Sequence, residues 1–264
     1  MNIVGIIAAR MGSSRLPGKP LKNICKIPMI GHIYYRSLKS KLLSSVYVAT
    51  CDEEINSYVK SINGKCIMTS KKHQRASERV AEALVKIENK TSKRIDIVVL
   101  IQGDEPLVTP KMIDKSIQPM INDKKIEITN LIQKITDKDK FNDPNEIKVV
   151  FDKNYNALYF SRSPIPFNQD KKNNRSFYGF KQVCIIPFKR NLLLEYIKLK
   201  PTILEEIESI DMNRLLDYNK KIKLILTKDI TKAVDTSKDL KLVERMMFKD
   251  KLYLSYKDKE YNEK

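Results

Sequence analysis

The residues with the clearest capacity for chemistry lie in a short basic loop, residues 10–19, directly after an apolar run. The loop combines cations with small residues, namely Arg10, Gly12, Ser13, Arg15, Gly18 and Lys19. Backbone N–H groups and cations placed after a strand are a common way for α/β proteins to hold phosphate. The spacing is not that of a Walker P-loop, because five residues separate Gly12 from Gly18-Lys19 and Pro20 has no hydroxyl. The loop therefore predicts a phosphate site of another kind, and the alternative is a surface loop that is merely basic.

Two aspartates follow other apolar runs. Asp104 comes after residues 95–102, and Asp235 comes after residues 222–226. Carboxylates at the carboxyl ends of strands suit a hard cation such as Mg²⁺, which takes one or two carboxylates together with phosphate oxygens. The alternative role for either residue is a helix cap, and Asp235-Thr236-Ser237 has the composition of a helix start. Taken with the basic loop, and from spacing and composition alone, these residues predict an α/β protein with a phosphate-binding loop.

The first half of the chain contains the elements that must position these residues. Apolar runs predict strands at 3–9, 46–50, 66–69 and 95–102, and helices at 28–43, after a cap at Asp52, and at 110–121. Strands that alternate with helices predict a mostly parallel sheet with right-handed crossovers. His32, inside the first helix, is expected to be a structural histidine.

The second half predicts more strands and a hairpin. We expect strands at 126–133, 181–188 and 222–226, a hairpin of 147–151 with 157–161, and an acidic helix at 204–217. The polar stretch 169–176 is expected to be mobile. We predict one α/β domain over 1–264, with 141–200 as a smaller inserted subdomain that carries the hairpin. The charged tail, 249–264, is expected to be poorly ordered or to form an oligomer contact.

Composition limits the classes of function. The 264 residues carry a net charge of +18, but the basic residues are scattered, so nucleic acid is not the expected partner. The four cysteines form no C-x-x-C pair, which argues against a zinc site. No apolar run approaches the roughly 20 residues of a membrane span, and no signal peptide is recognisable. A cytoplasmic protein with reduced thiols is the expectation.

Several segments carry a family resemblance, which covers most of the chain. They are the loop at 6–21, the segment with His73, Gln74, Ser77, Glu78 and Arg79, the motif Gln102-Gly103-Asp104-Glu105-Pro106, the stretches 143–150 and 157–166, the helix with Glu205, Glu208 and Arg214, and the stretch 233–240. The chain resembles the cytidylyltransferases that make CMP-linked acid sugars, in particular the branch that activates 3-deoxy-manno-octulosonate (Kdo). The resemblance implies a Rossmann-like nucleotidyltransferase fold. It also implies transfer of CMP from CTP to the anomeric hydroxyl of a 3-deoxy-2-ketoacid sugar, with release of pyrophosphate.

The resemblance also implies residue roles. The implied catalytic residues are Arg10, Lys19, Asp104 and Asp235, of which Asp104 and Asp235 would bind Mg²⁺. The implied nucleotide-binding residues are Ala8, Ala9, Arg10, Gly12, Ser13, Arg15, Lys19, His73, Ser77, Arg79, Gln102 and Gly103. The implied sugar-binding residues are Gln102, Arg162, Lys181, Gln182, Glu208 and Asp211. Arg162 remains open between a substrate contact and a scaffold role. The family also implies a homodimer assembled through the part of the chain that bears the hairpin.

Two departures fall in the implied sugar pocket. Lys181-Gln182 replaces the family's Arg-His pair, and Asp211-Met212 replaces Glu-Gln. Because Gln182 cannot change charge as histidine can, these positions predict an altered choice of acid acceptor. The alternatives are 8-amino-Kdo, a nonulosonic acid or a phosphonate. A basic nucleic-acid-binding protein that kept only the fold is disfavoured, because Asp104 and Asp235 would repel a polyanion.

Overall fold

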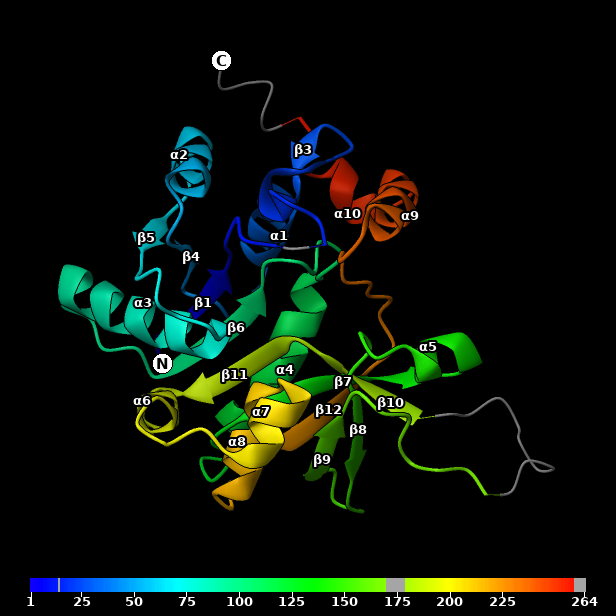
Figure 1. Cartoon of the computed structure of the whole chain (residues 1–264). Helices are drawn as coiled ribbons and strands as arrows, with labels where there is room; N and C mark the ends of the chain where they lie inside the picture. Colours follow the sequence, from blue (N-terminus) through cyan, green and yellow to red (C-terminus); the bar gives the residue numbers. More distant parts are fainter. Residues whose placement is uncertain (14, 170–178, 259–264) are drawn as a thin grey trace. The chain divides into compact units, whose positions relative to one another are not determined.

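A computed structural model describes residues 1–13, 15–169 and 179–258 (Figure 1). The chain divides into two compact units, Met1–Asp114 with Ile230–Lys264, and Lys115–Asp229. The segment 141–200 lies within the second unit, and its status as a separate subdomain stays a prediction. The predicted mobile stretch 169–176 falls almost wholly outside the described residues. Within the described residues, no helix has the length and apolarity needed to cross a membrane.

The first unit contains a parallel sheet built on the most apolar runs of the sequence. Its strands β1 (Ile3–Ala8), β4 (Ser45–Thr50), β5 (Cys66–Met68) and β6 (Ile97–Gln102) are ordered β6-β1-β4-β5, and every pair is parallel. Ile6, Ile7 and Ile101 are fully buried, as expected of strands covered on both faces. The predicted parallel βαβαβ arrangement is confirmed. The carboxyl ends of β1 and β6 are therefore neighbours, which is where the basic loop and Asp104 begin.

The helices of the first unit are α1 (Met29–Ser37), α2 (Glu53–Ser61), α3 (Ala76–Thr91), α9 (Ser237–Phe248) and α10 (Lys251–Leu254). A short hairpin of β2 (Asn23–Ile24) and β3 (Ile27–Pro28), which the sequence did not reveal, precedes α1. The helix predicted to reach residue 43 ends at Ser37. Just beyond its end, the carboxylate of Asp114 accepts hydrogen bonds from the Ser40 hydroxyl and from the amides of Lys41 and Leu42, which hold the chain in a turn.

The carboxyl-terminal segment packs onto α1. Tyr256 is 1% exposed, and its hydroxyl lies 2.8 Å from Nδ1 of His32, whose Nε2 lies 2.7 Å from the carbonyl of Ile24. Asp250 pairs with the buried guanidinium of Arg36 at 2.7 Å. The structural role predicted for His32 is confirmed. A poorly ordered tail is the wrong prediction for residues 250–256, and residues 259–264 lie outside the described part.

The second unit contains a mixed sheet. Its strands are β7 (Thr129–Ile135), β8 (Lys148–Phe151), β9 (Ala157–Ser161), β10 (Gly179–Val183) and β12 (Lys223–Thr227), in the order β12-β7-β10-β8-β9. Only the pairing of β12 with β7 is parallel. The antiparallel pairing of β8 with β9 confirms the predicted hairpin. The unit also contains β11 (Ile185–Lys189), α5 (Lys138–Asn142), α6 (Arg190–Tyr196), α7 (Ile203–Glu208) and α8 (Asp211–Asp217), while α4 (Pro110–Asn122) spans the sequence boundary between the units.

Two elements predicted as continuous are interrupted. The acidic helix 204–217 is two helices, because Ser209 adopts a left-handed conformation (φ 54°) and closes α7, with the amide of Ile210 donating to Glu205. The strand 181–188 is two strands that separate at Cys184. There, the side-chain amide of Asn130 binds the carbonyl of Val183, the last residue of β10.

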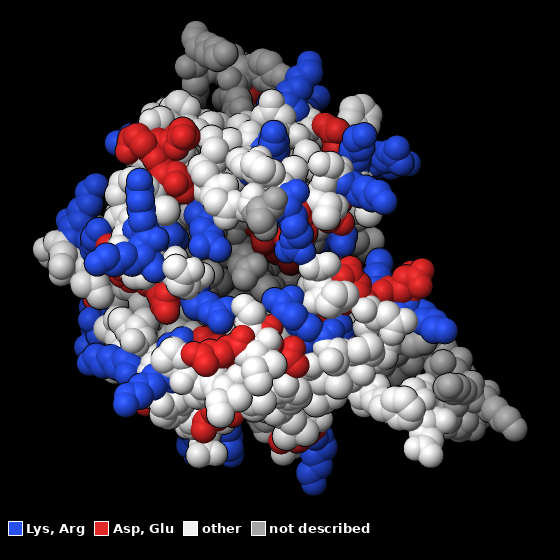
Figure 2. Space-filling view, in the orientation of Figure 1, with Lys and Arg blue, Asp and Glu red and all other residues white. Residues whose placement is uncertain are grey.

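Charged side chains are spread over the surface. Figure 2 shows lysine and arginine interspersed with aspartate and glutamate over the visible face, without one dominant basic patch. The net charge of +18 is therefore not gathered into a single surface on that face.

Candidate nucleotide and metal site

The basic loop is closed at its base by backbone hydrogen bonds. The amide of Gly18 donates to the carbonyl of Met11 at 3.4 Å, and Gly18 has a φ of 68°, which favours glycine. The amide of Met11 donates to Oδ2 of Asp52 at 2.7 Å. The two ends of the loop, Met11 and Gly18, therefore lie next to each other directly after β1.

The Gln102-Gly103-Asp104 turn lies against the end of β1. The amide of Gly103 donates to the carbonyl of Ala8 at 3.0 Å. A Cβ atom at position 103 would lie 2.6 Å from that oxygen, so only glycine allows this approach. Gly103 therefore has a structural reason to be glycine, and it brings Asp104 to the loop.

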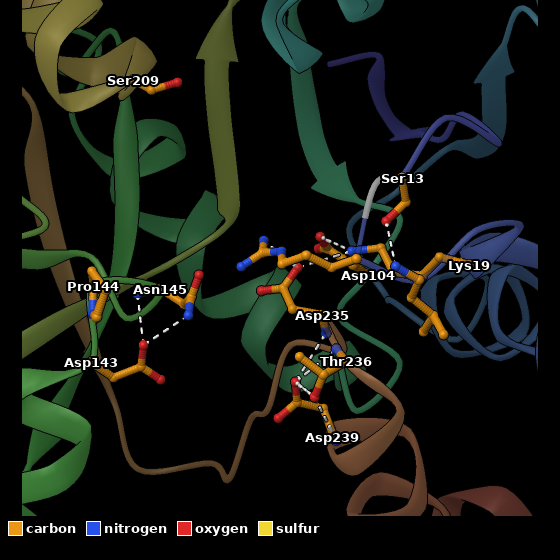
Figure 3. A network of polar contacts seen from close by, with 12 residues as sticks. Ser13, Lys19, Asp104, Asp143, Pro144, Asn145, Ser209, Asp235, Thr236 and Asp239 are labelled. Atoms are coloured by element: carbon orange, nitrogen blue, oxygen red, sulfur yellow. Dashed lines mark hydrogen bonds and ion pairs between the residues drawn. The ribbon is translucent and has the colours of Figure 1, made fainter.

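Lys19 joins the two predicted metal ligands. Its Nζ atom lies 2.9 Å from Oδ2 of Asp104 and 3.2 Å from Oδ1 of Asp235 (Figure 3). The guanidinium of Arg15 lies 3.0 Å from the same oxygen of Asp235. The amide of Val234 donates to the backbone carbonyl of Asp104 at 2.9 Å, which fixes the two segments side by side. Residues far apart in sequence thus form one cluster, which we call the carboxylate cluster: Arg15, Lys19, Asp104 and Asp235.

The cluster can accommodate a divalent cation. Oδ1 of Asp104 is buried and has no hydrogen-bond partner in the described part of the chain, so one carboxylate oxygen still lacks a donor or cation. Among the described residues, no group of three or more His, Cys, Asp or Glu side chains could hold a metal. Two carboxylates fit Mg²⁺, which completes its shell with water and phosphate oxygens, better than they fit zinc.

The electrostatics of the cluster favour a charged lysine. Burial alone would lower the pKa of Lys19, but the charge and hydrogen bond of Asp104, followed by those of Asp235, raise the pKa above its ordinary value. Lys19 therefore stays cationic, as a phosphate ligand must.

The helix-cap alternative for Asp235 is resolved by α9. Thr236 caps α9 by accepting the amide of Asp239, and the Asp239 side chain accepts the Thr236 amide in return. The side chain of Asp235 contacts Lys19 and Arg15 instead. The predicted helix start at 235–237 is confirmed, with Thr236 rather than Asp235 as the cap.

The segment before α3 is held by a carboxylate. Glu82 contacts Nε2 of His73 and accepts the amide of Ser70. Burial opposes the ionisation of Glu82, but hydrogen bonds from Lys86, Ser70 and His73 lower its pKa to about 2. Ser77 is buried, and so is Arg79, whose guanidinium donates to Oγ1 of Thr69. Arg79 therefore supports the end of β5, and the nucleotide contacts of these residues stay predictions.

The remaining predicted nucleotide-binding residues lie on the loop or at strand ends. Arg10 and Gly12 are exposed, Ala9 is buried, and Ala8 and Gln102 are half-buried at the ends of β1 and β6. Ser13 is half-buried and accepts the amide of Leu16 within the loop.

Arg162 and Glu208, two predicted sugar ligands, bind each other's segments. The amide of Arg162 donates to the carboxylate of Glu208, and its guanidinium donates to the carbonyls of Glu208 and Pro144. Glu208 also accepts hydrogen bonds from Tyr159 and Ser161. These contacts favour the scaffold role for Arg162, and sugar contacts for either residue stay predictions.

Lys181 and Gln182 are not brought together. Adjacent strand residues point to opposite faces, and each of these two side chains has its own partner. Lys181 pairs with Glu146 at 2.8 Å, and Gln182 donates to Asn130 at 2.6 Å. Asp211 is the first residue of α8. Lys181 and Gln182 therefore do not converge on one sugar carboxylate from the same face of β10.

Asp52 has a role at the loop that the sequence did not reveal. It occupies the predicted N-cap position of α2, but its side chain makes no cap hydrogen bond there and instead accepts the Met11 amide at the base of the loop. The only available signal was the position of a carboxylate directly after β4, next to β1.

A parallel sheet with a closed basic loop after β1 and carboxylates after β6 defines the nucleotidyltransferase class. A solved structure titled CMP:2-keto-3-deoxy-manno-octonic acid synthetase complexed with CTP matches the chain with a TM-score of 0.84 and 34% identity, covering 94% of this chain and 99% of the other. It confirms the predicted Rossmann-like nucleotidyltransferase fold.

A family model described as cytidylyltransferase matches residues 4–222. A 3-deoxy-manno-octulosonate cytidylyltransferase of Thermodesulfovibrio yellowstonii is 42% identical over 94% of this chain and 98% of its own length. One of the same name from Geotalea daltonii is 39% identical over 93% and 98%. The chain belongs to the cytidylyltransferase family, and it is an enzyme of the nucleotidyltransferase class.

Proposed function

We propose that the protein transfers CMP from CTP to the anomeric hydroxyl of a Kdo-like 3-deoxy-2-ketoacid sugar, with Mg²⁺ and with release of pyrophosphate. The observation that carries this proposal is the convergence of Lys19 on Asp104 and Asp235. The relatives named for Kdo, at 42% and 39% identity, support the choice of acceptor.

The residues of the first unit divide the work of charge neutralisation. Lys19 and the exposed Arg10 would bind the β- and γ-phosphates of CTP, and they would stabilise negative charge on the departing pyrophosphate. Asp104 and Asp235 would hold Mg²⁺, which supplies charge stabilisation at the phosphates and makes a nearby hydroxyl easier to deprotonate. Catalysis would then consist mainly of in-line positioning, and no side-chain nucleophile is required.

The acceptor is the finer part of the proposal. The departures at Lys181-Gln182 and Asp211-Met212 leave 8-amino-Kdo, nonulosonic acids and phosphonates as competing acceptors. In the structure, the Gln182 amide binds Asn130, so an acceptor would have to be recognised without a titratable group at this position. Substitutions of buried donors and acceptors shift discrimination by about 1–3 kcal/mol when a partner is left unpaired.

The experiment is a substrate panel. CTP and Mg²⁺ are supplied with Kdo, 8-amino-Kdo, a nonulosonic acid or a phosphonate, and pyrophosphate is followed. We expect CTP-dependent turnover with Kdo or a close relative, and none without Mg²⁺. Preferred turnover of UTP or dTTP with a neutral sugar 1-phosphate would overturn the proposal. Turnover of a phosphonate alone would retain cytidylyl transfer and reject the acid-sugar acceptor.

A homodimer and a cytoplasmic location are also proposed. The hairpin region resembles the part through which the family assembles, and Leu158 on β9 is 61% exposed, as an apolar contact residue would be before assembly. Light scattering at micromolar concentration should report a dimer. A monomer would contradict this part of the proposal.

A further inference from the structure

The carboxylate cluster is already neutralised by the protein's own cations. Two carboxylates, Asp104 and Asp235, face the cations Lys19 and Arg15 at 2.9–3.2 Å. The side chain of Lys19 is 12% exposed, and those of the two aspartates are each 23% exposed, so this pairing is only partly screened by water.

The position of Lys19 has a consequence for any divalent cation. Its Nζ atom contacts one oxygen of each carboxylate, Oδ2 of Asp104 and Oδ1 of Asp235, so a cation held by both residues would compete with the ammonium for these two atoms. Lys19 leaves two oxygens of the pair uncontacted, Oδ2 of Asp235 and Oδ1 of Asp104, and the second of these is buried and unpaired within the described residues. A divalent cation therefore finds a free oxygen on each residue but must compete with an ammonium for the other two.

We propose that Lys19 is an internal counter-cation that weakens the binding of divalent metal to the nucleotide-free protein. This inference rests on the proposed function, in which the same carboxylates hold Mg²⁺. A triphosphate offers Lys19 another anionic partner, and the departure of Lys19 would then release Oδ2 of Asp104 and leave Asp235 paired with Arg15 alone. The protein would then bind a divalent metal tightly when the nucleotide is also bound, and only weakly when it is absent.

Loss of Lys19 should raise the affinity of the nucleotide-free protein for a divalent metal. Removing a catalytic lysine would normally be expected only to weaken the site, but here it should strengthen metal binding to the free protein. Removing a like charge a few ångströms from a partly buried cation site favours the cation, because the interaction is only partly screened there. We therefore expect a gain of about tenfold or more in metal affinity.

The test measures Mn²⁺ binding to the nucleotide-free protein by electron paramagnetic resonance of free Mn²⁺. Lys19→Met removes the cation, and Lys22→Met is the matched control, because Lys22 is exposed on the same segment and its loss changes net charge equally. Lys19→Met should bind Mn²⁺ about tenfold or more tightly than the unmodified protein, while Lys22→Met should change the affinity by less than about twofold. Adding Asp104→Asn to Lys19→Met should remove the gain, which assigns it to the carboxylates.

A second readout covers a variant that folds poorly. Without Lys19, two carboxylates share the single cation Arg15, so Mg²⁺ should raise the melting temperature of Lys19→Met, or of Lys19→Gln, more than that of the unmodified protein. Unchanged or weaker Mn²⁺ binding, with no larger Mg²⁺ effect on melting, would overturn the inference. The measurement needs neither CTP nor acceptor, so an inactive substrate panel with a tenfold gain in Mn²⁺ affinity would reject the proposed function and keep this inference.

Discussion

The two units contain charged clusters of opposite character. In the first unit, the carboxylate cluster is held by ion pairs between side chains, and one buried oxygen of Asp104 has no partner among the described residues. In the second unit, Arg214 binds both oxygens of Glu205, and Arg162 donates mainly to backbone carbonyls. The first arrangement leaves a group for an added cation, whereas the second satisfies its charges internally.

This difference teaches how to interpret a matched charged residue. Glu205, Arg214, Asp104 and Lys19 all belong to stretches that resemble the family, so sequence similarity alone does not separate them. Charges paired internally contribute to the fold, and removing one partner leaves a buried charge. A buried carboxylate oxygen without a partner instead indicates a place where a ligand is expected.

The largest expected effect is loss of turnover in the first unit. Asp104→Ala and Asp235→Ala should each lower kcat by about a thousandfold or more, because each removes an anionic ligand of a cation that stabilises the transition state by several kcal/mol. Pyrophosphate release and thermal melting measure this, with the exposed Asp217→Asn as control. Near-normal rates in either variant would remove that residue from the metal site.

The next effect should be on stability and should fall in the second unit. Glu205→Gln leaves the guanidinium of Arg214, which is 4% exposed, without its carboxylate, and should lower the free energy of unfolding by about 3–5 kcal/mol. Urea denaturation measures this, and the exposed neighbour variant Glu206→Gln should be close to neutral. If Glu205→Gln keeps its stability but has a greatly reduced kcat, the scaffold role of Glu205 and Arg214 is contradicted.

The sequence revealed the elements whose signals are local. The apolar runs of β1 and β6, and the glycine-containing segments that follow them, predicted the strand ends that meet in the structure. Ser209 could not be predicted to end α7, because a non-glycine residue in a left-handed conformation leaves little sequence signal. The partner of Asp52 and the burial of Tyr256 depend on contacts with residues far away in the sequence, and propensity does not encode such contacts.

A pH dependence tests the buried contacts between α1 and the carboxyl-terminal segment. They belong to the first unit, and there His32 binds Tyr256 while Arg36 pairs with Asp250. Burial, with a smaller effect of Arg36, lowers the pKa of His32 to about 4, below its ordinary value of 6.5; Tyr256 and Asp250 also neighbour it. The unfolded chain therefore binds more protons between pH 6.5 and 4, and stability is lost as pH falls through this window. Between pH 7 and 5, the loss from this residue should be about 2 kcal/mol.

The measurement compares urea denaturation of the unmodified protein and His32→Gln at the two pH values. The variant should lose less stability on acidification, although it should be less stable at pH 7 through its lost hydrogen bonds. Identical pH slopes for the two proteins would show that His32 takes up a proton equally in both states.

The smallest expected effect concerns the base of the basic loop. Asp52→Ala leaves the Met11 amide without its acceptor and should raise the KM for CTP by about tenfold, with a smaller change in kcat. Asp52→Asn keeps an acceptor and should recover part of the loss, and the exposed Glu54→Ala is the control. An unchanged KM in Asp52→Ala would mean that the loop keeps its conformation without this contact.

The most direct measurement is an anomalous difference map from crystals of the protein with Mn²⁺ and CTP. We expect a Mn²⁺ peak bound by the carboxylates of Asp104 and Asp235, with Lys19 moved from between them onto phosphate oxygens. A peak that lies away from both aspartates, or a Lys19 that still joins them while Mn²⁺ and CTP are bound, would contradict the assignment of this cluster as the metal and nucleotide site.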